Sequence, residues 1–78
     1  MWIYIFYIDD PKYKTADVLN VSESTWKRIQ KDLEDGKTFL RFNPGEITDV
    51  TKKGETVITN TIYINMNNVY KIIADDIN

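Results

Sequence analysis

The first eight residues are the feature that most limits what this chain can fold into. They read MWIYIFYI, are all apolar, and run directly into Asp9-Asp10-Pro11. A helix needs roughly 20 apolar residues to cross a bilayer. No Lys or Arg precedes the stretch and no small-residue cleavage site follows it, so we expect no secretion signal. Aromatic and β-branched side chains favour a pleated backbone, and we predict a strand over residues 2–8.

This predicted strand is apolar on both faces. Alternation places Trp2, Tyr4, Phe6 and Ile8 on one side and Ile3, Ile5 and Tyr7 on the other. A single helix can cover only one of the two faces. The second face is then either covered by another layer or available as an interface.

One helix is predicted, over about residues 23–35. Ser22 suits the N-cap position, Glu23 suits the positive end of the helix dipole, and Gly36 can adopt the left-handed conformation that ends a helix. The helical spacing puts three apolar residues on one stripe: Trp26, Ile29 and Leu33. A serine nucleophile is the alternative role for Ser22, but the surrounding residues lack the Gly-x-Ser-x-Gly pattern.

The rest of the chain alternates with period two between turn residues. We predict strands over residues 13–21, 37–42, 46–51, 56–65 and 69–73, the last with a turn of helix as the alternative. Turns are predicted at Asp10-Pro11, at Asn43-Pro44-Gly45, at 52–55 and at Asn67-Asn68. In the long strand 56–65, the predicted core face carries Ile58, Asn60, Ile62 and Ile64.

These elements predict one α+β domain over residues 1–78, with a flexible polar tail at 75–78. The order β-β-α-β-β-β favours an antiparallel sheet with one helix packed on one face. The alternative is a strongly bent sheet or partial barrel with the helix plugging one end.

The composition restricts the chemistry. The chain contains no His and no Cys, which excludes histidine bases, thiolate nucleophiles and Cys/His metal sites. Its three glycines lie at predicted turns and form no phosphate-binding pattern. Asp9-Asp10 and Asp75-Asp76 could hold Mg²⁺ or Ca²⁺ together, but turn and tail positions explain both pairs. We expect no enzyme, no cofactor and no metal.

The first functional hypothesis is a cytoplasmic binding module that acts by protein–protein contact, including self-association. Tyr and Trp are enriched at such interfaces. The predicted interaction surface is Trp2, Tyr4, Tyr7 and Tyr63. Abundant Ile, Asn and Lys with scarce Ala and Arg resemble AT-rich coding. This composition favours a phage or mobile element of a low-GC bacterium, and an inhibitor or adaptor of a host protein.

The second hypothesis is binding of single-stranded nucleic acid. A net charge of −2 argues against gripping a duplex, but aromatic rings on a sheet can stack on bases. The candidate rings are those of the predicted interaction surface and Tyr13. The candidate phosphate contacts are Lys12, Lys14, Lys52, Lys53 and Lys71.

Overall fold

The computed structural model describes residues 1–9, 16–49 and 56–75. Its elements are β1 (Trp2–Tyr7), β2 (Ala16–Val21), α1 (Glu23–Glu34), β3 (Phe39–Phe42), β4 (Ile47–Asp49), β5 (Thr56–Val57), β6 (Ile62–Asn65), the short 3₁₀ helix η1 (Met66–Asn68) and β7 (Val69–Asp75). The predicted small α+β fold, with one helix and antiparallel strands, is confirmed. The predicted turns at 10–11 and 52–55 and the end of the tail at 76–78 lie outside the described residues.

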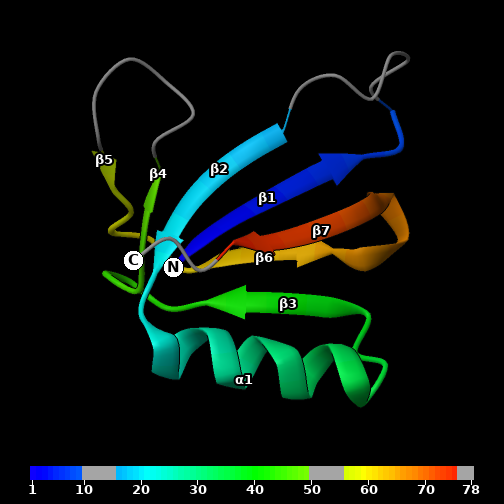
Figure 1. Ribbon diagram of the computed structural model, residues 1–78, viewed down its shortest axis with the longest axis horizontal. Coiled ribbons are helices and arrows are strands. Elements are labelled where there is room, and N and C mark those ends of the chain that lie inside the picture. Colours follow the sequence, from blue (N-terminus) through cyan, green and yellow to red (C-terminus); the bar gives the residue numbers. More distant parts are fainter. Residues whose placement is uncertain (10–15, 50–55, 76–78) are drawn as a thin grey trace.

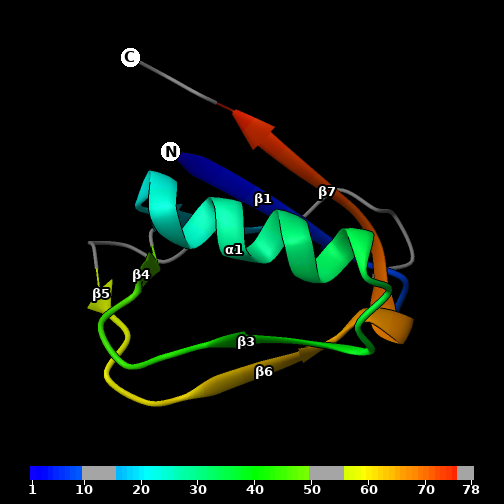
Figure 2. The ribbon, with the colours of Figure 1, turned by 90° about the horizontal axis from the view of Figure 1, so that it is seen from below.

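The strands form two sheets, and β1 lies inside the larger one. Five strands follow the order β5-β4-β2-β1-β7, and β3 pairs with β6 in a second sheet. Every pairing is antiparallel. Helix α1 runs alongside β3 at one edge of the molecule (Figure 1), and in the view from below it lies between β1 and β7 on one side and β3 and β6 on the other (Figure 2). The apolar segment at the start of the chain is therefore a central strand with hydrogen-bonded neighbours on both sides.

The strand expected over residues 56–65 is divided in two. Its first part, β5, pairs with β4 in the larger sheet, and its second part, β6, pairs with β3 in the smaller one. Thus β3–β4 and β5–β6 are the two arms of one hairpin, and both arms change sheets at the same corner. Residues 58–61 make this corner and carry no strand structure.

The corner is built by turn chemistry and backbone hydrogen bonds. Asn43 to Glu46 form a turn in which the Glu46 N–H donates to the Asn43 carbonyl at 3.1 Å. Pro44 holds the second position and Gly45 has φ +80°, as a type II turn requires. Two backbone hydrogen bonds cross the corner. The Gly45 N–H donates to the Ile58 carbonyl at 2.7 Å, and the Ile58 N–H donates to the Ile47 carbonyl at 3.0 Å. The two arms therefore bend together.

The core joins both sheets to the helix. Its buried apolar members are Ile3, Ile5, Leu19, Val21, Ile29, Leu40, Phe42 and Ile47. Of the predicted core face in 56–65, Ile58, Ile62 and Ile64 pack partly buried against this cluster, whereas Asn60 is exposed. Since the sheets bend around α1, the arrangement matches the bent-sheet alternative more closely than a single flat layer. Among the described residues, no helix is long and apolar enough to cross a membrane.

A matched pair of substitutions tests this core. Ile5 is 1% exposed and Ile8 is 50% exposed. We expect Ile5→Val to lower the free energy of unfolding by about 0.5–1.5 kcal/mol, because it leaves a cavity of one methyl group. Ile8→Val should change it by less than about 0.5 kcal/mol. Urea titrations of both variants measure the difference, and equal losses would contradict the place given to Ile5 in the core.

Candidate interaction surface

The outer face of the five-stranded sheet carries an apolar row. Trp2, Tyr4 and Phe6 alternate with the buried Ile3 and Ile5, so they point away from the core. All three are half-buried and therefore partly open to solvent.

Neighbouring strands extend this row sideways. Val18 of β2 and Ile73 of β7 lie directly opposite Tyr4, and directly opposite residues share a face. We call the set Trp2, Tyr4, Phe6, Val18 and Ile73 the outer face. Two of the four predicted interaction residues, Trp2 and Tyr4, belong to it.

The outer face is charged at its two ends with opposite signs. Lys71 lies opposite Phe6, with its Nζ 4.8 Å from the centre of the Phe6 ring. Asp75 lies opposite Trp2 at the other end of β7. The apolar centre is thus flanked by a cation at one end and a carboxylate at the other.

Tyr7 and Tyr63, the other two predicted interaction residues, lie elsewhere. The Tyr7 hydroxyl donates to Asp17 Oδ2 at 2.9 Å. Burial of Tyr7, together with this hydrogen bond and the negative charge of Asp17, raises the pKa of the Tyr7 hydroxyl well above its ordinary value. Tyr63 lies on β6 of the smaller sheet and is 64% exposed. The structure therefore divides the predicted set into an outer-face pair and two separate residues.

Tyr7 and Tyr63 nevertheless line one hollow of about 460 Å³. Its other lining residues are Asp9, Ile62, Ile64, Asn65 and Asn68. A second hollow, of about 350 Å³, lies between α1 and the smaller sheet and also contains Tyr63. Its lining residues are Arg28, Asp32, Lys37, Phe39, Arg41 and Tyr63. We call it the cationic hollow, because three of these six side chains carry a positive charge.

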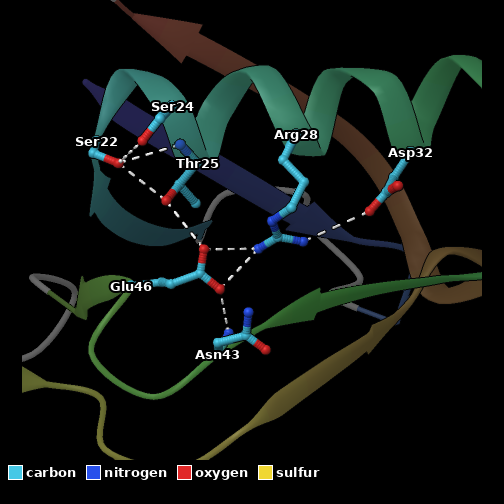
Figure 3. A network of polar contacts seen from close by, with 7 residues as sticks. All are labelled: Ser22, Ser24, Thr25, Arg28, Asp32, Asn43 and Glu46. Carbon is cyan, nitrogen blue, oxygen red and sulfur yellow. Dashed lines mark hydrogen bonds and ion pairs between the residues drawn. The ribbon is translucent and has the colours of Figure 1, made fainter.

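Glu46 holds Arg28, one of the residues that line the cationic hollow, in a network of polar contacts (Figure 3). Its carboxylate accepts hydrogen bonds from Arg28 Nη2 at 2.9 Å to each oxygen, and from the Asn43 N–H at 2.6 Å. The Thr25 hydroxyl donates a further bond at 3.1 Å. Arg28 is also 3.7 Å from Asp32, one helical turn further on. This network ties α1 to the hairpin corner and holds the guanidinium of Arg28 in place.

The predicted N-cap belongs to the same network. Ser22 Oγ accepts from the Thr25 N–H at 3.2 Å, and the Ser22 hydroxyl donates to Thr25 Oγ1 at 3.0 Å. Thr25 in turn reaches Glu46. The interpretation of Ser22 as a helix cap is confirmed.

Partial burial alone would raise the pKa of Glu46. The hydrogen bonds from Asn43, Arg28 and Thr25, with the positive charge of Arg28, outweigh this effect and lower the pKa below its ordinary value. The folded state therefore favours the ionised carboxylate.

The prediction from sequence did not include Arg28, Phe39 and Arg41 in a candidate site. The signal for two of them was present, since the alternation in 37–42 puts Phe39 and Arg41 on one face, opposite the buried Leu40 and Phe42. No pattern in the sequence indicates that α1 brings Arg28 to the same place.

The lysine surface predicted for nucleic acid lies largely outside the described residues. Only Lys71 is described, and it packs over Phe6. Tyr13 also lies outside the described part of the chain. Across residues 1–9, 16–49 and 56–75, no group of three or more carboxylates gathers as a metal site would require.

Comparisons with known proteins add no relative: no family model, no curated protein and no solved structure matches the chain.

The Glu46 network predicts a pH dependence of stability. A carboxyl group whose pKa is lowered by folding stabilises the protein above its unfolded pKa of about 4.5, and this contribution is lost as the pH falls through the folded value. Replacing Glu46 by Gln removes the charge and turns an amide N–H toward other donors. We expect Glu46→Gln to cost about 1–3 kcal/mol at neutral pH.

The pH dependence of the free energy of unfolding distinguishes the loss of the Glu46 charge from a loss of stability that does not depend on pH. The stability gap between the wild type and Glu46→Gln should narrow as the pH falls below about 4.5, measured by urea midpoints at several pH values. Glu34→Gln, at the exposed C-terminal end of α1, is the control and should leave stability nearly unchanged. Parallel profiles for the wild type and Glu46→Gln would contradict the role given to Glu46.

Proposed function

We propose that this chain is a non-enzymatic binding module that acts by protein–protein contact through the outer face. The observation that supports the proposal is the position of β1. It is a central strand with apolar side chains on both faces, and α1 and the smaller sheet occupy only one of them. Small inhibitors and adaptors encoded by phages or mobile elements are the class of protein that fits the chain's size and composition.

The charges at the two ends of the outer face favour a second copy of this chain as the occupant. A two-fold axis that lies in the interface, perpendicular to the strands, would place β7 of one copy over β7 of the other in the opposite direction. Lys71 of one copy would then face Asp75 of the other at both ends. Tyr4 and Ile73, at the middle of the outer face, would pack against their own equivalents.

The size of the chain provides a further reason for such a contact. A domain of 78 residues buries only about 60% of the surface that its unfolded chain exposes. It also has no disulfide with which to compensate. Covering the half-buried rings of Trp2, Tyr4 and Phe6 with a second copy would add to its apolar burial.

A charge exchange tests the proposed contact. Lys71→Glu would set two carboxylates against each other at each end of the interface, and Asp75→Lys would set two ammonium groups there. We expect each variant to weaken self-association by roughly tenfold. The double variant should restore it, because the opposite charges face each other again. Light scattering and sedimentation velocity over a range of concentrations measure the association.

The control is Lys27→Glu, which makes the same change of charge on an exposed helix position and should leave self-association unchanged. A wild-type protein that stays monomeric at high concentration would contradict the second copy as occupant. If both single variants fold but the double variant does not recover self-association, the antiparallel arrangement of the two outer faces is contradicted.

A further inference from the structure

The cationic hollow concentrates positive charge in a chain whose net charge is −2. Arg28, Lys37 and Arg41 line it, against one acidic residue, Asp32. Arg28 is held by Glu46 and Asp32. Within the described part of the chain, neither Lys37 nor Arg41 has a salt bridge. Two cations are therefore available to an anionic ligand.

Two exposed aromatic rings stand beside these cations. Phe39 and Arg41 lie two residues apart on β3, and Tyr63 lies directly opposite Arg41 on β6. Phe39 is 52% exposed and Tyr63 is 64% exposed, whereas Leu40 between Phe39 and Arg41 is 1% exposed. Large rings left in solvent can stack on bases. The guanidinium beside them, which has no salt bridge within the described part of the chain, can bind an anion.

We propose that the cationic hollow binds single-stranded nucleic acid. Arg41 and Lys37 hold the phosphates, and a base stacks on Tyr63 or Phe39. Arg28, fixed by Glu46, forms the rigid wall on the helix side. This site is separate from the outer face and does not depend on self-association.

The shape of the surface favours a strand over a single bound nucleotide. Tyr63 lines both hollows, so the two adjoin the same residue. The hollow of about 460 Å³ is also lined by Asn65 and Asn68, and side-chain amides of this kind can hydrogen-bond the edges of bases. Each hollow is at the lower end of the size range of ligand pockets, about 300–1,000 Å³. An extended strand can place one nucleotide in each and cross Tyr63 between them.

The ring exposure also favours nucleic acid over an acidic peptide. A peptide carboxylate would use Arg41 and Lys37 but would leave the faces of Phe39 and Tyr63 without a matching partner. Bases present flat faces that stack on such rings without regard to sequence.

Fluorescence anisotropy of a labelled oligothymidylate, titrated with the full chain at several salt concentrations, tests the proposal. We expect binding that weakens as salt rises. Tyr63→Ala should lower affinity at least about fivefold, since stacking of one base is worth about 1–3 kcal/mol. Arg41→Ala should lower the slope of log affinity against log salt by about 0.7, the value for one phosphate of a single strand.

Matched controls distinguish this site from general attraction to cations and rings. Lys27→Ala removes one exposed charge outside the hollow, and Tyr70→Ala removes a ring that is 54% exposed on β7. Both should bind the oligonucleotide as the wild type does. Circular dichroism of each variant confirms that the fold is kept.

Several results would overturn the proposal. One is no binding by the wild type at low salt, and another is unchanged affinity in Tyr63→Ala. Equal losses in Lys27→Ala and Lys37→Ala would show a non-specific charge effect. Displacement of the oligonucleotide by polyglutamate as readily as by unlabelled strand would assign the hollow to acidic protein segments. Equally effective displacement by AMP would assign it to free nucleotides.

Discussion

The carboxylate of Glu46 is the interaction on which the arrangement of the helix and the two sheets depends. It lies at the corner where the long hairpin passes from the larger sheet to the smaller one, and it binds the first half of α1 through Thr25 and Arg28. It also accepts a hydrogen bond from the Asn43 N–H, which joins the first and last residues of the turn Asn43–Glu46. Together with the core contacts of Ile29, this side chain fixes the position of the helix against the bend. Because Arg28 is held at the same point, the geometry of the cationic hollow depends on this carboxylate too.

Much of the fold could be predicted because its signals are local. The ends of α1 are predicted to within a few residues by Ser22, by the apolar stripe of Ile29 and Leu33, and by Gly36. The structure places that helix at Glu23–Glu34. The alternation of Trp2 to Tyr7 likewise defines β1. Each of these features depends on side chains and backbone preferences a few positions apart, which a single sequence records directly.

The division of 56–65 and the composition of the surface could not be predicted in the same way. Residues 58–61 continue the β-type alternation, yet they leave the ladder because their partner segment turns at Pro44 and Gly45. That constraint comes from a strand elsewhere in the chain. The predicted interaction set is divided for two reasons. Tyr7 lies on the face of Ile5, opposite Trp2 and Tyr4, and its hydroxyl donates to Asp17, the cross-strand neighbour of Ile5. Tyr63 lies on β6, which belongs to the smaller sheet. Arg28 joins Arg41 only through the packing of α1 beside β3.

The pairing of β1 with β7 has a consequence for how the chain reaches its native state. Trp2 pairs with Asp75 and Ile3 with Ala74, so strands at opposite ends of the described chain must meet. Contacts between such distant segments carry a large entropy of loop closure and slow folding. During synthesis, β1 leaves the ribosome long before its partner exists. Until β7 arrives, the most apolar segment of the chain has an open edge, and this interval is when aggregation competes most strongly with folding.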